Sequence, residues 1–321
     1  MPCKTLITGA SGYIGGSLCK SLAARGFFVK GIGRSPITPA GVAQYGCVDL
    51  EKDPVDELLQ GVETIVHLAG RAHVLNEAAA DPITLFRRVN VDATLQLAKS
   101  AVASGVKRFV FVSSIGVNGT ETGEAPFTEE SGDHPHSPYA ISKFEAEAEL
   151  KNLVRRSSME LVIIRPPLVY AGDAPGNFAR LLKLVAMGLP LPFLASENRR
   201  SLVALENLIN FIIVCMEHPA AAGETFLISD GTEISTADIV RSLSTGMGRR
   251  PRLVYIPVSW IRCGARLMRR DNLYSQLFGS LVVDSSKAQR LLGWTPPVST
   301  AEALCQAGEN YMKSLSNKGR D

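Results

Sequence analysis

A run of closely spaced glycines near the start of the chain constrains the fold more than any other feature. Residues 8–15 read TGASGYIG, with glycines at positions 9, 12 and 15, between a short apolar run and a helical pattern. Glycines at a strand-to-helix turn remove the side chains that would keep a pyrophosphate from the N–H groups of the helix N-terminus. The sequence therefore predicts a dinucleotide-binding turn, although a tight turn without a ligand would use the same spacing.

The first half of the chain alternates between short apolar runs and helical patterns. Runs of strand character lie at residues 5–8, 27–32, 64–68, 108–112 and 161–164, and the longest helical patterns cover 83–103 and 138–156. This alternation predicts an α/β fold with a doubly wound parallel sheet of the Rossmann type. We expect residues 1–170, with 201–230 returning to them, to form the dinucleotide-binding domain. A smaller C-terminal α/β substrate lobe is expected from residues 171–200 and 231–321.

The composition excludes several classes of protein. Hydrophobic residues make up 45% of the 321 residues, and 34 Lys and Arg nearly balance 31 Asp and Glu. A net charge of +3 is too small to indicate nucleic acid as a partner, and no apolar run approaches the ~18 residues of a membrane span. No secretory segment is evident, and the six cysteines are scattered, so we expect a cytoplasmic protein with reduced thiols and no metal site.

The end of the second predicted strand carries the signal for the type of cofactor. A carboxylate about twenty residues after the glycines usually holds a ribose 2′-hydroxyl, but here Gly33 occupies that place and Arg34 follows. An arginine can pair with a 2′-phosphate, so NADP(H) is favoured and NAD(H) remains possible. Asp49, after the third short strand, could accept a hydrogen bond from the adenine amine or cap a helix near Val55.

Two further segments predict a reactive site. The strand ending at Val112 is followed by Ser114, and Tyr139 lies 25 residues later with Lys143 four positions after it. Tyr and Lys at positions i and i+4 share one face of a helix. Because this helix follows the fifth strand, both side chains are expected near the carboxyl ends of the strands, where ligands bind in open α/β sheets.

Six motifs together resemble the extended short-chain dehydrogenase/reductase family, in its nucleotide-sugar epimerase, dehydratase and reductase branch. They are TGASGYIG (8–15), HLAG (67–70), VSSIGVNG (112–119), YAISK (139–143), RPPLVYA (165–171) and DSSKAQRLLGW (284–294). The resemblance implies that Tyr139 transfers a proton to or from a sugar oxygen and that Ser114 hydrogen-bonds the same oxygen. It implies that Lys143 lowers the pKa of Tyr139 and holds the nicotinamide ribose. The implied cofactor contacts are Gly9, Gly12, Tyr13, Ile14, Gly15, Arg34, Asp49, Leu50, Leu68, Ala69, Gly70, Tyr139, Lys143 and Pro166.

Departures from the family pattern narrow the chemistry. Sugar 4,6-dehydratases of the family carry an Asp-Glu pair directly after the catalytic Ser or Thr, and Ile115 and Gly116 stand there in this chain. Neither residue can transfer a proton, so dehydration is not expected. Asn118 replaces the usual Tyr, and Gly70 stands where Ala is common, but neither change removes a reactive group.

The C-terminal half is expected to hold the substrate. Asn177, at the start of a helix, and Arg200 are the candidates for the sugar-nucleotide diphosphate, with Arg199 as the fallback. The family's second phosphate arginine is missing from residues 279–283, and Arg269 or Arg270 could replace it. Uridine is the expected nucleotide, although this gap leaves lipid-linked diphosphate sugars open.

These features predict an oxidoreductase acting at C4 of an activated hexose. Reduction of a 4-keto-6-deoxy (N-acetyl) sugar is favoured, because Arg34 indicates NADPH and a reductase consumes NADPH from the cellular pool. The alternatives are a 4-epimerase of UDP-hexose or UDP-N-acetylhexosamine and, in another class, an NADP-binding redox-sensing regulator.

Two surface features accompany this prediction. By resemblance, residues 83–103 and 138–156 are expected to pair two copies into a homodimer. A basic helical pattern at residues 260–270 is expected to pack on the substrate lobe, with contact to a membrane surface as the alternative.

Overall fold

The computed structural model describes residues 4–72, 81–268 and 271–318 of the chain. Its centre is a seven-stranded parallel sheet with the order β3-β2-β1-β4-β5-β6-β9. The strands are β1 (Lys4–Thr8), β2 (Phe28–Gly33), β3 (Gln44–Cys47), β4 (Thr64–His67), β5 (Arg108–Val112), β6 (Glu160–Arg165) and β9 (Thr225–Leu227). The strand order reverses at β1, which is the topological switch point of a doubly wound sheet and the expected position of a ligand crevice. The predicted fold class is confirmed.

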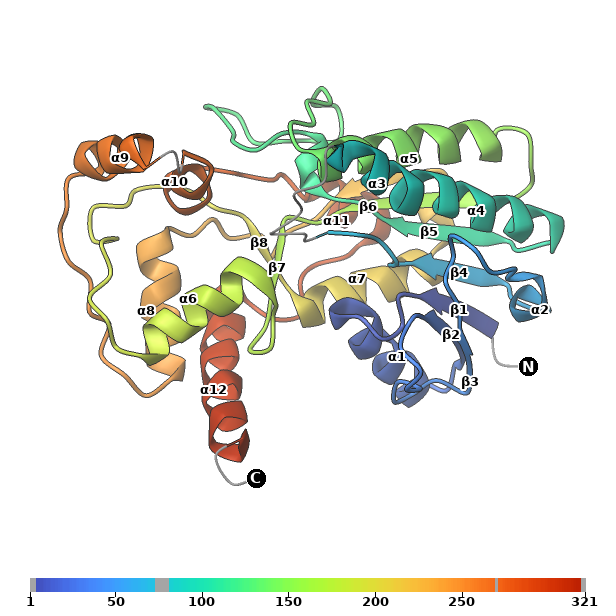
Figure 1. Ribbon diagram of the computed structural model, residues 1–321, viewed down its shortest axis with the longest axis horizontal. Coiled ribbons are helices and arrows are strands. Elements are labelled where there is room, and N and C mark those ends of the chain that lie inside the picture. Colours follow the sequence, from blue (N-terminus) through green and yellow to red (C-terminus); the bar gives the residue numbers. More distant parts are fainter. Residues whose placement is uncertain (1–3, 73–80, 269–270, 319–321) are drawn as a thin grey trace.

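Helices cover both faces of this sheet (Figure 1). One face carries α1 (Tyr13–Ala24) and α7 (Leu205–Glu217), and the other carries α3 (Pro82–Arg87), α4 (Ala93–Ala103) and α5 (Pro138–Val154). The strands are apolar on both sides for this reason: Ile7 packs in the core with α1 and α7, and the adjacent Leu6 packs in the core with α4 and α5. Short α2 (Asp56–Leu59) lies between β3 and β4 in the chain.

The C-terminal lobe is smaller and mostly helical. Strands β7 (Leu168–Tyr170) and β8 (Leu202–Ala204) form a separate parallel pair. Around them lie α6 (Gly176–Ala186), α8 (Thr236–Gly246), α9 (Val258–Leu267), α10 (Asp271–Phe278) and α12 (Thr300–Lys318). The lobe has its own core, with Phe178, Leu182, Leu243 and Leu304 among its buried residues.

One helix of the C-terminal sequence packs on the dinucleotide-binding side. Helix α11 (Ser286–Leu292) contacts β9, and Ala288, Leu292 and Trp294 belong to the core beneath the main sheet. We therefore propose the domain boundaries that the sequence predicts, with one change. Residues 286–294 belong to the dinucleotide-binding domain and not to the substrate lobe. Strand β9 lies within the 201–230 segment and pairs with β6.

The long helix expected over residues 83–103 is interrupted. Helix α3 passes through a π-helical segment, η1 (Arg88–Asp92), before α4 begins. This segment turns Asn90 inward, where its side chain is 1% exposed and bonds to Ser142 and to the backbone of Arg71. A π-helical turn inside an α-helix often marks a functional site, and here it brings a buried amide next to α5.

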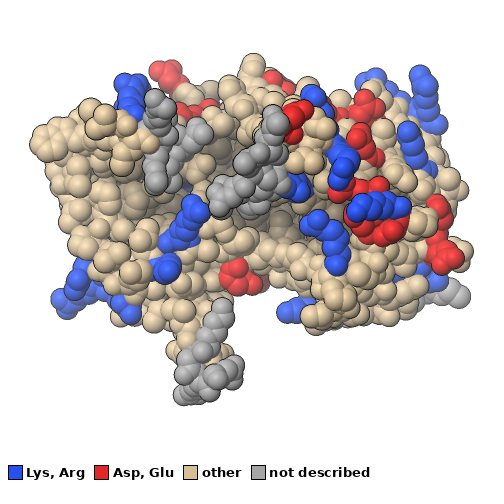
Figure 2. Space-filling view, viewed as in Figure 1, with Lys and Arg blue, Asp and Glu red and all other residues tan. Residues whose placement is uncertain are grey.

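Acidic and basic side chains are interspersed over much of the dinucleotide-binding half in the view of Figure 2. Among the helices that the structure describes, none is long and apolar enough to cross a membrane.

Candidate active site

The glycine turn has the backbone geometry that the sequence predicts. Gly9 has φ of +68°, and a Cβ there would lie 2.9 Å from the Ala69 backbone nitrogen. A Cβ on Gly15 would lie 2.1 Å from the Gly9 carbonyl oxygen, so α1 can approach the turn only with glycine at this position. The N-terminus of α1 has no capping side chain and no acidic residue in its first turn. Its N–H groups are therefore available to an anion.

A pocket of about 630 Å³ opens beside this turn. Eight of the predicted cofactor residues line it: Gly9, Gly12, Arg34, Asp49, Leu50, Leu68, Ala69 and Gly70. Tyr13 and Ile14 instead pack against the apolar cores beneath the turn. Gly15 is buried behind the turn. The pocket therefore joins residues that follow the ends of four strands, β1, β2, β3 and β4, as a dinucleotide site at the switch point requires.

The end of β2 is shaped by a tyrosine that sequence reasoning missed. A Cβ on Gly33 would lie 2.6 Å from the Tyr45 hydroxyl and 2.8 Å from Ser11 Oγ, so these two groups occupy the space of a side chain at position 33. Tyr45 donates a hydrogen bond of 2.8 Å to the Ser35 carbonyl oxygen. Arg34 is exposed at the edge of the pocket.

Asp49 does not cap the helix near Val55. The N-cap residue of α2 is Val55, without a capping side chain, and Asp49 Oδ1 accepts from the Glu51 backbone N–H at 3.2 Å. The carboxylate also pairs with Lys52 at 3.6 Å. Asp49 thus organises its own turn at the pocket edge, and the helix-cap alternative is wrong.

The Ser114 turn lies next to the start of the catalytic helix. Ser114 caps a short 3₁₀ turn, η2 (Ile115–Val117), because its Oγ accepts from the Gly116 backbone N–H at 3.1 Å. A Cβ on Gly116 would lie 3.4 Å from both Ser114 Oγ and Ala140 Cβ. The Ser114 hydroxyl therefore lies close to the residue that follows Tyr139, and among the residues that the structure describes none accepts its proton, which leaves it to donate to a ligand. Pro166 completes the turn through its carbonyl oxygen, which accepts from Ile115 N–H at 3.0 Å.

Tyr139 and Lys143 project from the first two turns of α5. The helix begins at Ser137, whose Oγ accepts from Ala140 N–H at 3.1 Å, with Pro138 in the first turn. Lys143 is 3% exposed, donates to the Val112 carbonyl oxygen at 2.9 Å and lies 4.5 Å from the Phe111 ring centroid. A Cβ on Gly70 would lie 3.5 Å from Lys143 Nζ, so the ammonium group borders the cofactor pocket.

Burial sets the proton affinities of this pair in opposite directions. Desolvation raises the pKa of Tyr139 to about 12 and lowers the pKa of Lys143 to about 8, the latter partly offset by the charge of Glu147. Burial disfavours the charged form of each group. We expected Lys143 to lower the pKa of Tyr139. In the protein alone that pKa is raised, and the Lys143 ammonium group donates to the Val112 carbonyl oxygen.

A buried ionic network behind the site was not predicted. Glu147, one turn beyond Lys143, is 1% exposed and accepts from Ser113 Oγ and from Arg165 Nη2, both at 2.5 Å. Arg165, at the end of β6, also donates to Asn118 and to Asp133 at 3.0 and 2.8 Å. The network ties α5 to the ends of β5 and β6. Asn118, which departs from the family pattern, is therefore an acceptor for Arg165.

His67 of the HLAG motif is a structural residue. Its ring lies between the hydroxyls of Thr8 and Thr94, each 2.8 Å from a ring nitrogen, and stacks on Phe111. Burial lowers its pKa to about 3, so the ring is neutral at physiological pH. Thr8 Oγ1 also accepts from Leu68 and Ala69 N–H groups at 3.2 Å, which holds the pocket loop in place.

The two predicted substrate residues lie in the C-terminal lobe. Arg200 is half-buried and donates to the Gly279 carbonyl oxygen at 3.0 Å, and burial lowers its pKa. Arg199 is exposed and paired with Glu233. Asn177, in the first turn of α6, donates to Gln276 of α10 at 2.5 Å. Arg269 and Arg270 lie outside the described residues.

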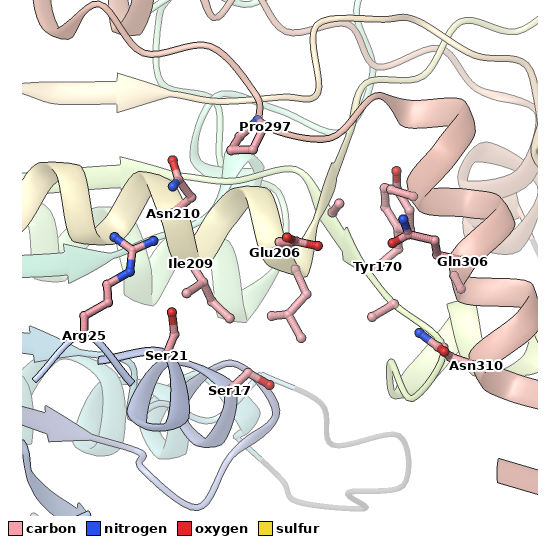
Figure 3. A pocket seen from close by; sticks show the side chains of 16 residues that line it. Ser17, Ser21, Arg25, Tyr170, Glu206, Ile209, Asn210, Pro297, Gln306 and Asn310 are labelled. Atoms are coloured by element: carbon pink, nitrogen blue, oxygen red, sulfur yellow. The ribbon is translucent and has the colours of Figure 1, made fainter. Parts of the chain in front are cut away.

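A second pocket, of about 380 Å³, lies between α1, α7 and α12. Figure 3 shows Arg25, Ser21 and Asn210 on one side of it and Gln306 and Asn310 of α12 on the other. Ser114, Tyr139 and Lys143 do not line this pocket. It therefore takes no part in the candidate chemistry.

Comparison with known proteins agrees with this geometry. Residues 5–229 match the model of the NAD dependent epimerase/dehydratase family. A "UDP-glucose 4-epimerase" of Vibrio cholerae is 39% identical over 98% of this chain and 97% of its own length. An Escherichia coli O157:H7 relative, "N-acetyl-alpha-D-glucosaminyl-diphospho-ditrans,octacis-undecaprenol 4-epimerase", is 27% identical over 79% of this chain and 75% of its own.

A solved structure shows the same fold. The UDP-glucuronic acid 4-epimerase of Bacillus cereus in complex with NAD superposes with a TM-score of 0.78, at 23% identity, over 97% of each chain. The chain belongs to the NAD-dependent epimerase/dehydratase family of extended short-chain dehydrogenases/reductases.

Proposed function

We propose that this protein transfers hydride and a proton at C4 of a UDP-activated hexose, with 4-epimerisation as the first candidate reaction. The observation that carries the proposal is the position of the Lys143 ammonium group, which lies beside Gly70 of the cofactor pocket and donates to Val112, next to the Ser114 turn. Tyr139 lies one turn before it on the same helix. Ile115 is buried and Gly116 has no side chain, so the turn offers no acid or base for dehydration. The 39% identical relative carries the name of a 4-epimerase.

The residues of the pocket fit a nicotinamide dinucleotide. The glycines at positions 9 and 15 leave no room for a side chain, and the open N-terminus of α1 suits a pyrophosphate. Lys143 would hold the nicotinamide ribose, because its ammonium borders the loop at Gly70. When bound, the nicotinamide ring would supply the hydride acceptor and donor.

Three side chains would carry the proton chemistry. Tyr139 would accept the proton of the sugar 4-hydroxyl as C4 is oxidised, and return it when C4 is reduced. Ser114 would donate its free hydroxyl proton to the same oxygen and stabilise the charge that changes there. Lys143, kept cationic below its pKa of about 8, would favour the tyrosinate electrostatically. Burial alone holds the pKa of Tyr139 near 12, so this assistance is needed.

The diphosphate would lie on the C-terminal lobe. Arg200 is half-buried, and its guanidinium group makes one hydrogen bond to a described residue, at the Gly279 carbonyl oxygen, so it retains donors for a phosphate. Asn177 would help through its place in the first turn of α6. A polyprenyl-linked diphosphate sugar, the substrate named for the Escherichia coli relative, presents the same diphosphate to these groups.

Reduction of a 4-keto-6-deoxy sugar is the second candidate, and the Gly33–Arg34 pair favours it. Position 33 is a glycine and carries no carboxylate that would repel a 2′-phosphate. Tyr45 and Ser11 fill the space that a side chain would occupy there. Arg34, exposed at the pocket, offers a planar donor fork to phosphate oxygens. A net reductase would use NADPH as a consumed reactant, whereas an epimerase would regenerate NAD in each turnover.

One experiment tests the function and separates the two candidates. The purified protein is incubated with UDP-glucose or UDP-N-acetylglucosamine without added reductant, and the C4 epimers are quantified by NMR. A parallel reaction contains a UDP-4-keto-6-deoxy sugar with NADPH, followed by nicotinamide absorbance. Epimer formation supports the first candidate, and stoichiometric NADPH consumption with no epimer formation supports the second.

The Tyr139→Phe variant tests the mechanism in either assay. Loss of the hydroxyl removes a general acid–base group, so turnover should fall by about 10²–10⁴-fold with cofactor binding retained. Tyr311→Phe, which removes a hydroxyl in α12, is the matched control and should keep full turnover. Full activity of Tyr139→Phe, or inertness of the wild-type protein in both assays, would refute the proposal.

A further inference from the structure

Helix α9 lies at the far end of the C-terminal lobe (Figure 1). It leaves a large apolar stripe uncovered. Trp260 is 73% exposed and Leu267 is 87% exposed, and with Cys263 they follow one another at helical spacing on the same side of the helix. Ala265 is the one fully buried residue of α9. The expectation that this basic helical pattern packs on the lobe is therefore wrong for its Trp260 side.

The same region concentrates the positive charge of the chain. Residues 239–270 contain eight arginines and no acidic residue, so the remainder of this +3 chain carries a net charge of −5. Arg262 and Arg266 lie one turn apart on α9 and are exposed. Three further exposed arginines precede the helix: Arg249, Arg250 and Arg252. Within the described parts of the chain, no carboxylate forms an ion pair with any of these five.

We propose that α9 and the segment leading to it dock on an anionic lipid surface. An exposed tryptophan, large aliphatic side chains and unpaired arginines without intervening acids are the properties of a helix that lies in a membrane interface. Tyr255, 68% exposed in the preceding segment, extends the amphipathic surface. A protein partner with an apolar groove would also cover the stripe, but the uncompensated charge favours a surface that is uniformly negative.

Vesicle binding tests this assignment directly. The full-length protein is sedimented with vesicles of phosphatidylglycerol mixed with phosphatidylcholine, and with vesicles of phosphatidylcholine alone. Binding is expected to the anionic vesicles and to weaken as salt is raised. The chain has two tryptophans, and Trp294 is 6% exposed, so a blue shift of emission on binding reports burial of Trp260.

Substitutions distinguish charge from apolar insertion. Arg262→Ser with Arg266→Ser should weaken binding to anionic vesicles about 30-fold, at about 1 kcal/mol per arginine near the surface. Replacement of both by Lys should retain most of it. The matched control is Arg155→Ser with Arg156→Ser, two exposed arginines after α5, which should bind as wild type does.

Two results would overturn the proposal. One is equal binding to neutral and anionic vesicles, or no binding to either. The other is the absence of vesicle binding together with self-association in sedimentation velocity that Trp260→Ser abolishes. That result would assign the stripe to contact with a second copy of this chain. Each variant should give the same circular dichroism spectrum as the wild type, which would show that the substitutions at exposed positions leave the fold intact.

Discussion

Substitution of Arg165 by Met is expected to be among the most damaging changes outside the residues that contact ligands. Arg165 is 3% exposed and its guanidinium bonds to Glu147, Asn118 and Asp133. Methionine has a similar length but no charge, so Glu147 would remain buried with Ser113 as its nearest partner and with Lys151 at 3.8 Å. Removal of one partner from a buried ion pair leaves an uncompensated charge.

The expected loss in the free energy of unfolding is about 3–5 kcal/mol. Arg165→Met combined with Glu147→Leu removes both charges, so the double variant should be more stable than Arg165→Met alone. Urea unfolding followed by circular dichroism gives the four free energies of this cycle. A loss below about 1 kcal/mol in Arg165→Met, or a double variant less stable than both single variants, would refute the argument.

The same substitution should affect catalysis beyond its effect on stability. Glu147 follows Tyr139 and Lys143 at four-residue intervals on α5, so the ion pair holds the helix that carries both reactive groups. Leu150→Ala, a cavity substitution of a fully buried residue on the same helix, is the matched control with an expected loss of about 2–5 kcal/mol. At a temperature where both variants are folded, kcat should fall in Arg165→Met and change little in Leu150→Ala.

Four further predictions follow from the structure. His67 is neutral when folded, with a pKa of about 3 against 6.5 unfolded, so its contribution to stability is complete above pH 6.5. That contribution should decline by about 1.4 kcal/mol per pH unit as the pH falls toward 3. In urea titrations at several pH values, the free energy of unfolding of His67→Gln should therefore fall less steeply with decreasing pH than that of the wild type. Gly15→Ala should abolish cofactor binding in calorimetry, whereas Gly16→Ala, whose Cβ would meet its nearest atom at 3.6 Å, should retain it. Arg34→Ala should lower NADPH affinity about 10- to 150-fold and leave NADH affinity unchanged, and equal losses for both cofactors would contradict the 2′-phosphate contact. We expect the chain to sediment as a dimer paired through α4 and α5, and we expect Leu95→Asp with Leu153→Asp, at half-buried positions of a hollow between these helices, to sediment as a monomer.

The sequence predicted the fold well where local patterns determine it. The strand at 108–112 coincides with β5, and the helix after Pro138 begins there because proline suits a first turn and Ser137 caps it. The interruption at η1 was not predictable, because it depends on Asn90 reaching Ser142, a residue 52 positions away.

In the candidate site too, the residues set by a local pattern could be predicted and those set by long-range contacts could not. Gly9, Gly12 and the pocket residues could be inferred because a phosphate turn has a fixed spacing along the chain. Tyr45 could not, because it lies on the neighbouring strand β3 and its importance comes from its hydroxyl, which fills the space of a side chain at Gly33. The exposure of Trp260 was also beyond sequence reasoning, since an amphipathic pattern shows that a helix has an apolar side but not whether anything covers it.

Helix α5 shows why reactive residues are easier to recognise than the residues that position them. Tyr139, Lys143 and Glu147 form one stripe, and the first two are proposed to act on a ligand through their own chemistry, so their spacing alone carries information. Glu147 acts through Arg165, which lies 18 residues away on β6, and Arg165 in turn binds Asp133 in the loop before the catalytic helix. No local pattern links these three residues, because parallel strands bring their ends together only in the folded sheet. The ionic network is nevertheless contiguous with the reactive stripe. The stability of this region and the orientation of Tyr139 should therefore change together when the network is altered.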